Sequence, residues 1–359
     1  MTAPRPPLEL NEVDRRIWAE ELEGFVPQRV FDVHTHVYRW SFNTDPDRET
    51  GTRAELIGRT FPESSRAMLA ACDAALMPGR RVHRLSFGFP FWPACDFEAS
   101  NNWAATEAGG DRGSAALMLV HPAMTPQYLE SQIASHGFVG LKPYRFYSRT
   151  DDAVQCRITD FLPEEQIAVA NARGLILMLH LAKRDAVADS ENIDELLRLT
   201  TAYPRAKWIL AHCARSYSAW PIERALDRLA GLPNVWYDTS SVCESDAIEA
   251  LLAGAGPERV MYGSDDVPVG VSRGKYITFG YAWAFLSEKN HSLDLSHCSP
   301  GMTFVRYEQL RAMRRAALRM RLTREQIEDL FHNTAAGLVQ SAQRSYANPL
   351  SHLDGEVTW

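Results

Sequence analysis

The sequence has little of what marks a secreted, membrane or nucleic-acid-binding protein. Its 359 residues include only 6 cysteines, which are scattered and form no CxxC pair, so we expect free thiols rather than a disulfide framework. No stretch approaches the roughly 20 apolar residues of a membrane span, and the first residues lack the apolar core of a signal peptide. These absences predict a cytoplasmic protein.

Positive charge is also scarce. Lys and Arg number 38 against 45 Asp and Glu, which gives a net charge of −7, and no basic cluster stands out. A nucleic acid or an anionic membrane is therefore not an expected partner. The expected partner is a small-molecule substrate, and self-association into a homo-oligomer is left open.

What the sequence does contain is a series of short apolar runs separated by amphipathic stretches. Most runs are apolar on successive residues, which is typical of parallel strands covered on both faces. Several of the stretches between them end in Gly or Pro, where helices stop. The eight expected strands are RVFDVHTH (29–36), VHRLSFGF (82–89), AALMLVHP (115–122), FVGLKPY (138–144), LILMLHLA (175–182), KWILAHCA (207–214), NVWYDTSS (234–241) and RVMYGSDD (259–266).

Eight alternations of strand and helix predict an α/β protein, a single-domain (β/α)₈ TIM barrel. A doubly wound open sheet is the competing architecture, but it usually carries a Gly-rich phosphate-binding turn after its first strand, and VHTHVYRW is no such turn. The predicted boundaries are an N-terminal extension at 1–27, the barrel at 28–345 and a C-terminal tail at 346–359. Long loops at 38–61 and 267–304 follow the first and last strands, where we expect them to shape a substrate site.

Chemically active residues gather at the predicted strand ends. Residues two apart on a strand point to the same side, so His34 and His36 present both rings to the barrel mouth. His180 and His212 stand near the ends of the fifth and sixth strands, and Asp265 closes the eighth. A single histidine late in a buried strand is often a hydrogen-bonded core residue. Five such placements at one rim instead predict a site for a catalytic divalent ion.

These motifs resemble the amidohydrolase superfamily over roughly residues 28–340. They are HTH (34–36), the strand-five histidine, LAHC (210–213), YDTSS (237–241), GSDD (263–266) and FHNTAAGL (331–338). The similarity is to the amidohydrolase-related group that includes aminocarboxymuconate-semialdehyde decarboxylase and small lactonases. It implies one divalent ion, most often Zn²⁺ with Mn²⁺ as the alternative, held by His34, His36, His180 and Asp265. By the same resemblance, His212 is either a further ligand or the acid/base beside the metal-bound water. Asp265 or His212 would take the proton of that water and return it to the leaving group.

Lys142, in GLKPYR, has two interpretations under this resemblance. In binuclear members of the superfamily a carboxylated lysine at this strand bridges two metals, whereas in the single-metal group the lysine commonly faces substrate, which is the interpretation we favour. The group frequently reads GxKLHP, so Pro143 and Tyr144 depart from its pattern and weaken any transfer of substrate identity. The residues expected to line the pocket, with the cations pairing a substrate carboxylate, are Lys142, Arg39, Trp40, Tyr144, Arg145 and Arg215.

The predicted function is a metal-dependent hydrolase that cleaves an ester, lactone or amide bond of a small carboxylated substrate. The alternative is a metal-dependent non-oxidative decarboxylase that uses the same ligands. Ser240 and Ser241 lack an adjacent base in the sequence, so a serine nucleophile is not expected, and Asp266 is assigned no catalytic role. A scaffold with a vestigial site would be marked by lost ligands, and all five are present.

Overall fold

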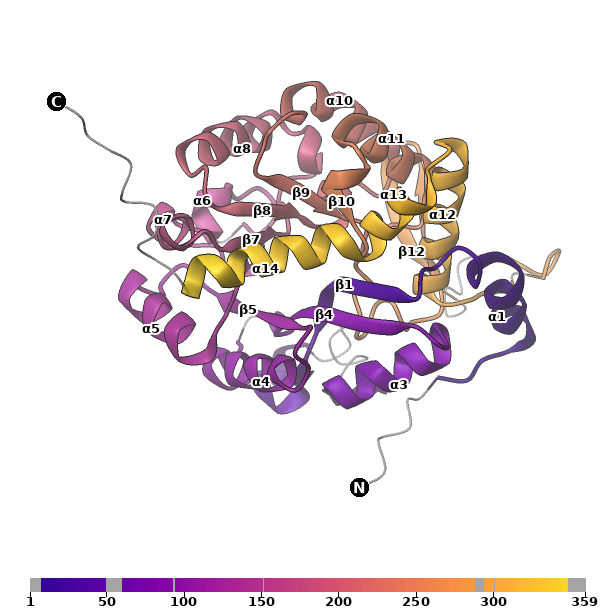
Figure 1. Cartoon of the computed structure of the whole chain (residues 1–359), viewed down its shortest axis with the longest axis horizontal. Coiled ribbons are helices and arrows are strands. Elements are labelled where there is room, and N and C mark those ends of the chain that lie inside the picture. The colour runs from indigo at the N-terminus through magenta and orange to yellow at the C-terminus, as the bar shows by residue number, and fades with distance from the viewer. Residues whose placement is uncertain are drawn as a thin grey trace.

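The centre of the fold is a sheet of eight parallel strands surrounded by helices (Figure 1). The computed structural model describes residues 8–49, 60–92, 94–150, 152–287, 294–299 and 301–347. The strands pair in chain order, so each strand lies beside the next along the sequence, and all eight predicted strands are present. They are β1 (Arg29–His36), β4 (Arg81–Phe87), β5 (Ala115–Val120), β6 (Gly140–Pro143), β7 (Ile176–Leu179), β8 (Lys207–Leu210), β9 (Val235–Asp238) and β10 (Val260–Met261).

Backbone hydrogen bonds between the first strand and the residues directly after the last strand close this sheet. The amide of Val33 donates to the carbonyl of Tyr262 at 3.1 Å, and the amide of Asp265 donates to the carbonyl of His34 at 2.9 Å. Helices fill the connections between successive strands, as right-handed parallel crossovers require. The predicted (β/α)₈ barrel is therefore confirmed.

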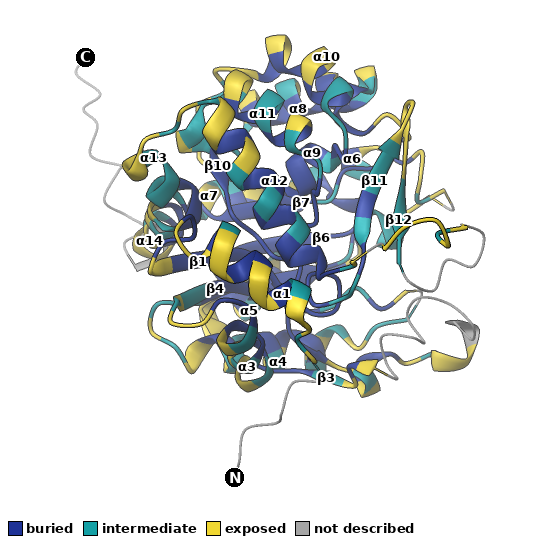
Figure 2. Ribbon diagram, turned by 90° about the vertical axis from the view of Figure 1, so that its right-hand side faces the viewer, coloured by how far each residue is buried: buried dark blue, intermediate teal, exposed yellow. Residues whose placement is uncertain are grey.

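The strands are apolar because both of their faces are covered (Figure 2). Side chains such as Phe31, Met178 and Ile209 pack with one another and with α14 (Thr334–Ala347), whereas Val30, Leu177 and Leu210 belong to the larger core that the other helices complete. The described α-helices in the connections after β1 to β9 are α3 (Arg66–Leu76), α4 (Phe97–Gly109), α5 (Pro126–His136), α6 (Ile158–Phe161), α7 (Glu164–Arg173), α8 (Ser190–Ala202), α9 (Ala211–Arg215), α10 (Ala219–Leu229) and α11 (Ser245–Ala255). Of these, α9 is a short turn with left-handed backbone from His212 to Arg215.

Local signals fix the ends of several helices. Ser65 and Thr125 cap the N-termini of α3 and α5 by accepting hydrogen bonds from the amides of Met68 and Tyr128. Gly137 ends α5 in a left-handed conformation with φ of 69°, which glycine adopts without steric cost. These ends bring the chain back to the start of the next strand.

The described part of the predicted N-terminal extension packs onto the barrel domain. It forms α1 (Glu12–Ile17) and the π-helix η1 (Trp18–Leu22). Trp18 stacks on Tyr307 of α12 (Val305–Arg319) with ring centroids 6.3 Å apart, and Asp14 pairs with Arg273 at 2.5 Å. This segment is therefore tied to the helices that follow the last strand.

The two long loops contain short elements of their own. The first holds β2 (Tyr38–Arg39), which pairs with β3 (Glu63–Ser64), and the short 3₁₀ helices η2 (Trp40–Phe42) and η3 (Pro46–Glu49). The second holds a hairpin of β11 (Lys275–Phe279) and β12 (Ala282–Leu286). Residues 50–59, 288–293 and 300, within these loops, and most of the predicted C-terminal tail lie outside the described residues.

The chain after α12 continues through α13 (Arg324–Glu328) and a π-helical turn η7 (Asp329–Asn333) into α14. In the part of the chain that is described, no helix combines the length and the apolar character needed to cross a bilayer.

Candidate metal centre

Three histidines and one aspartate predicted from the sequence gather at the C-terminal ends of the strands. His34, His36, His212 and Asp265 are all buried, with at most 7% of any of them exposed. The ring centroid of His34 lies 5.5 Å from that of His36 and 4.8 Å from that of His212. Nε2 of His34 and Nε2 of His36 lie 3.6 Å and 3.2 Å from the same oxygen, Oδ1 of Asp265. His34, His36 and Asp265 therefore offer ligand atoms within 4.8 Å of one another.

Backbone irregularities bring these side chains together. The register of β1 against β4 shifts between Asp32 and Thr35, so the strand does not continue its simple alternation through His34. His212 and Asp265 lie beyond their strands in left-handed backbone, with φ of 58° and 61°. Such conformations cost about 1–3 kcal/mol for a residue other than glycine and cluster at functional sites. The sequence places both residues at strand ends but gives no sign of this conformation.

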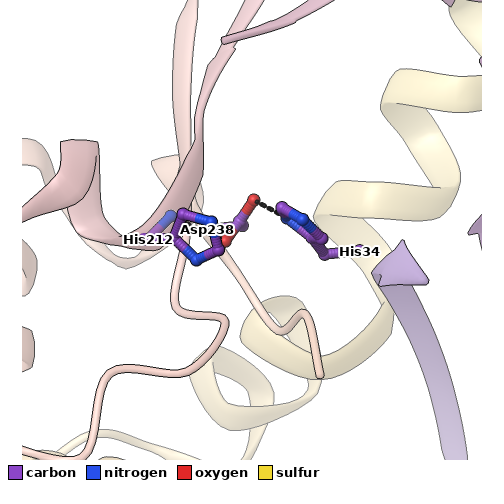
Figure 3. Close-up of side chains that lie close together, drawn as sticks. All are labelled: His34, His212 and Asp238. Atoms are coloured by element: carbon purple, nitrogen blue, oxygen red, sulfur yellow. Dashed lines mark hydrogen bonds and ion pairs between the residues drawn. The ribbon is translucent and has the colours of Figure 1, made fainter. Parts of the chain in front are cut away.

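Asp238, at the end of β9, lies between His34 and His212 (Figure 3). Its Oδ2 accepts a hydrogen bond from Nδ1 of His34 at 3.0 Å, and its Oδ1 accepts from the amides of His212 and Ser240, both at 3.0 Å. Burial raises the pKa of Asp238, but the charge and hydrogen bond of His34 outweigh burial and hold that pKa below its ordinary value. Asp238 is therefore an anion that fixes two of the histidines.

The four histidines share one pattern of hydrogen bonding. Nδ1 of each ring lies within hydrogen-bond distance of an oxygen: Oδ2 of Asp238 for His34, the carbonyl of Gly88 at 3.4 Å for His36, the carbonyl of Leu181 at 3.3 Å for His180, and the carbonyl of Ser240 at 3.0 Å for His212. An imidazole that donates from Nδ1 presents the lone pair of Nε2. A histidine that binds a metal through Nε2 usually makes such a hydrogen bond from Nδ1.

The protonation of the cluster agrees with a ligand role. Burial lowers the pKa of His34 to about 4, against the raising effect of Asp238, so the ring is neutral at pH 7. Burial also lowers the pKa of His180 well below its ordinary value, and nearby cationic groups add to the effect. Burial raises the pKa of Asp265, but the hydrogen bond with His36 and the nearby imidazoles lower it by more. Neutral imidazoles beside a carboxylate are what a divalent cation requires.

His180, the fourth predicted ligand, lies at the edge of this group. It follows β7, is half-buried, and forms a parallel bridge with Tyr144. Its ring centroid is 5.1 Å from that of His212. It belongs to neither of the two described groups of three that hold ligand atoms within 4.8 Å, which are His34, His36 and Asp265, and His34, His212 and Asp238.

Lys142 and Tyr144 reach the same region from the end of β6. Lys142 is fully buried, and Nζ lies 4.9 Å from the ring centroid of Phe87 and 4.8 Å from that of Tyr144. Neither Nζ of Lys142 nor the hydroxyl of Tyr144 has a hydrogen-bond partner among the described residues. Burial lowers the pKa of Lys142 to about 7, although Asp238 and Asp265 raise it. Two buried donors are thus available to a bound molecule.

The three predicted arginines lie in two different environments. Arg145 and Arg215 are half-buried near His180, where they lower its pKa, and each donates to a backbone carbonyl, Arg145 to Ala153 at 2.7 Å and Arg215 to Lys183. Burial and repulsion by Arg215 together lower the pKa of Arg145 to about 10. They form a cationic region next to the histidines.

Arg39 and Trp40 contact residues of β3, of α4 and of the segment that follows β4. Nε of Arg39 pairs with Glu63 at 3.0 Å, and its guanidinium lies 3.9 Å from the ring centroid of Trp103. The ring of Trp40 packs edge-on against Phe91 at 5.6 Å. The charge of Arg39 already has a partner, so its predicted contact with substrate gains no support from these contacts.

Three residues of the YDTSS segment have contacts that the sequence did not predict. We expected Ser240 and Ser241 to lack a neighbouring base, but Oγ of Ser240 lies 2.9 Å from Nδ1 of His212 and Oγ of Ser241 donates to Oδ2 of Asp265 at 2.6 Å. Both serines are fully buried, and their hydroxyl groups contact the side chains of the site residues. Asp238 also received no role. Its position at the C-terminal end of a barrel strand was the signal that could have identified it.

Comparisons with known proteins agree with this architecture. A crystal structure of an amidohydrolase from Burkholderia multivorans with bound HEPES matches 87% of this chain and 99% of its own, with a TM-score of 0.57 and 14% identity. A 2,6-dihydroxybenzoate decarboxylase complexed with 2,6-dihydroxybenzoate matches 88% and 99%, with a TM-score of 0.53 and 12% identity. Amidohydrolase 2 from Bifidobacterium longum subsp. infantis matches 88% and 99%, with a TM-score of 0.53 and 18% identity.

At these identities the structural matches establish the fold. No curated protein sequence matches the chain. The model of the amidohydrolase family, however, matches residues 31–340, which include every residue of the site and the whole barrel sheet except the first two residues of β1. This chain is therefore a member of the amidohydrolase family.

Proposed function

We propose that the protein is a metal-dependent hydrolase that binds one divalent ion, Zn²⁺ by preference, and cleaves an ester, lactone or amide bond of a small carboxylated substrate. The observation that carries the proposal is the common hydrogen bonding of the four imidazoles, each of which has Nδ1 against a carboxylate or carbonyl oxygen. The set of nitrogen and carboxylate ligands suits Zn²⁺, and Mn²⁺ is the alternative. His34, His36 and Asp265 would hold the ion, with His180 as the fourth ligand.

The residues around this site account for the chemistry of hydrolysis. When bound, such an ion supplies Lewis acidity and lowers the pKa of water to about 7. The Asp265 carboxylate, one oxygen of which accepts a hydrogen bond from Ser241, would take the proton of the attacking water and return it to the leaving group. His212, whose Nδ1 lies against the carbonyl of Ser240, is the alternative group for this proton transfer, through its Nε2. Lys142 and Tyr144 donate to developing negative charge on the substrate.

The cationic region supports a carboxylated substrate. Lys142, Arg145 and Arg215 approach from the ends of β6 and β8, and the contacts of the two arginines described above are to neutral carbonyls. A substrate carboxylate would supply the missing anion through charge-assisted hydrogen bonds. Lys142 then faces substrate rather than bridging two metals.

A non-oxidative decarboxylase is the second candidate. The buried, unpartnered donors of Lys142 and Tyr144 favour it, because they could stabilise the charge left when a carboxylate departs as CO₂. The fold is shared with a 2,6-dihydroxybenzoate decarboxylase. The same residues therefore serve both candidates, and only the reaction catalysed distinguishes them.

One set of experiments tests both the metal and the reaction. Protein purified without chelator is analysed for metal by mass spectrometry and assayed on a panel of lactones and esters, alongside carboxylated aromatics monitored for CO₂. We expect one equivalent of metal and turnover of the first panel. CO₂ release without hydrolysis would favour the decarboxylase, and two equivalents would assign Lys142 a bridging role. Protein that takes up no divalent ion contradicts both candidates.

His180→Ala tests the fourth ligand. We expect lower metal content and lower activity, because the lone pair of Nε2 is lost. His297, which is exposed, provides the matched control, and His297→Ala should retain both. Full metal occupancy in His180→Ala would remove His180 from the ligand set.

A further inference from the structure

Behind the metal centre lies a buried network of three carboxylates and two guanidiniums. Arg306, on α12, has 1% of its surface exposed, and its Nη1 pairs with Oδ1 of Asp73 on α3 at 2.7 Å. Its Nη2 contacts Oδ2 of Asp266, and Arg84 on β4 contacts the other oxygen of Asp73. Asp32 on β1 completes the network, because it lies opposite Arg84 in the register of β1 against β4.

The members of this network adjoin the proposed ligands in sequence. Asp266 follows Asp265, and the left-handed backbone at Asp265 lets the two consecutive carboxylates diverge, one toward His34 and His36 and the other toward Arg306. The carbonyl of Asp266 accepts from the amide of His36 at 2.5 Å.

On β1, Oδ1 of Asp32 accepts hydrogen bonds from the amide of His34 at 3.2 Å and from the amide of Ser264 at 2.8 Å. The backbone at His34, at His36 and just before Asp265 is thus hydrogen-bonded to Asp32 or Asp266 of the network.

Two further contacts join α12 to the segment that carries Asp265. The amide of Arg306 donates to the carbonyl of Gly270 at 3.0 Å, and Nε2 of Gln309 donates to the carbonyl of Gly263 at 2.7 Å. Gly270 also leaves the space that Asp266 uses, because a Cβ there would lie 2.0 Å from Oδ1 of Asp266. The start of α12 therefore holds this segment from outside the barrel.

Stability alone is a weak reason for such a network. A buried ion pair costs desolvation energy that its attraction barely recovers, and apolar side chains of similar volume often replace it without loss. A guanidinium, however, fixes two carboxylates in a defined geometry through its planar fork. Residues that orient metal ligands from the outer shell typically change metal affinity about 10–100-fold when they are replaced.

We propose that Arg306 is a positioning residue for the metal centre, which ties together from behind the barrel wall the segments that carry His34, His36 and Asp265. This inference rests on the proposed function, because it requires that these residues bind a divalent ion. Arg306 acts through Asp266 and Asp73 and makes no contact of its own with the reacting atoms.

The double variant Arg306→Met, Asp266→Asn tests the proposal, because it removes the pair without leaving Asp266 as an unpaired buried charge. The matched control is Arg273→Met, Asp14→Asn, which removes another ion pair with a fully buried aspartate, one that joins α1 to the loop before α12. Zn²⁺ affinity is measured by competition with a chromophoric chelator, and folding by circular dichroism and thermal melting in EDTA.

We expect both double variants to fold and only the first to lose affinity for Zn²⁺, by 10-fold or more on the scale typical of outer-shell residues. Equal affinity in the two double variants overturns the positioning role. If the first variant does not fold, Arg306→Lys is measured instead. It keeps the charge but not the fork, and we expect several-fold weaker binding, so wild-type affinity overturns the proposal. Wild-type protein that binds no Zn²⁺ contradicts the proposed function itself, which separates the two failures.

Discussion

Asp238→Asn keeps the shape of the side chain that holds His34 but changes one of its two acceptors into a donor. Oδ1 of Asp238 accepts from the amides of His212 and Ser240 and from the hydroxyl of Ser240. Three donors at this atom require that the asparagine keep its oxygen there. Its NH₂ group then occupies the position of Oδ2 and faces Nδ1 of His34, 3.0 Å away.

A donor facing Nδ1 reverses the tautomer of His34. Nδ1 must then accept, the proton moves to Nε2, and the lone pair directed toward Asp265 is lost. Outer-shell changes of this kind typically cost 10–100-fold in metal affinity, which corresponds to about 1.4–2.8 kcal/mol. We expect Asp238→Asn to lie in this range or beyond it, because the substitution also leaves the site without one of its negative charges.

The assay is a Zn²⁺ titration in competition with a chromophoric chelator, with folding checked by circular dichroism in EDTA. Asp246→Asn is the control, because that carboxylate is three-quarters exposed on α11 and pairs with Arg319. The control should bind Zn²⁺ like the wild type. If Asp238→Asn also binds Zn²⁺ with unchanged affinity, the tautomer of His34 does not govern the site and the reasoning fails.

Three other outcomes are expected. Gly263→Ala places a Cβ 2.7 Å from Cβ of His34, so we expect a loss of about 1–3 kcal/mol in unfolding free energy together with weaker Zn²⁺ binding. The unfolding free energy is measured by urea titration. In the control Gly24→Ala the added Cβ has no neighbour within 4 Å, so this variant should show neither effect. Lys142→Met should stabilise the metal-free protein. The lysine holds its proton up to about pH 10.5 when unfolded but only up to about pH 7 when folded, so the cost of burying its charge is complete below pH 7 and disappears as the pH rises through 10.5. This change in pKa corresponds to at most about 5 kcal/mol, and urea unfolding in EDTA should show a larger gain at pH 6 than at pH 10. An equal gain at both values would contradict the assigned pKa. Finally, Zn²⁺ at 100 times its dissociation constant should raise the unfolding free energy by about 2.7 kcal/mol over EDTA-treated protein, and superimposable unfolding curves would argue against a metal site.

The strands and their order could be predicted because burial on both faces leaves a signal in nearby residues. LILML, for example, is apolar throughout because every side chain of β7 is covered. The same regularity located His34, His36, His212 and Asp265, since parallel strands in a barrel all bring their C-terminal ends to one rim. The prediction required only the position of each residue within its own strand.

The roles of Asp238, Ser240 and Asp266 depend on contacts that no local pattern contains. Ser240 and His34 are 206 positions apart, and Arg306 and Asp73 are 233 positions apart. We predicted that Ser240 would have no neighbouring base and assigned Asp266 no catalytic role, because each was judged from its neighbours in sequence. The structure places the first beside two histidines and the second against a buried arginine.

The sequence by itself determined the barrel, the rim at which its polar residues meet and the chemical types of the candidate ligands, because these follow from periodicity and residue type. The tertiary structure decided which nitrogen of each histidine faces the centre and where the backbone turns left-handed. It also decided which outer groups hold the ligands. These features depend on atoms brought together from distant segments, whose positions are set only when the whole barrel closes.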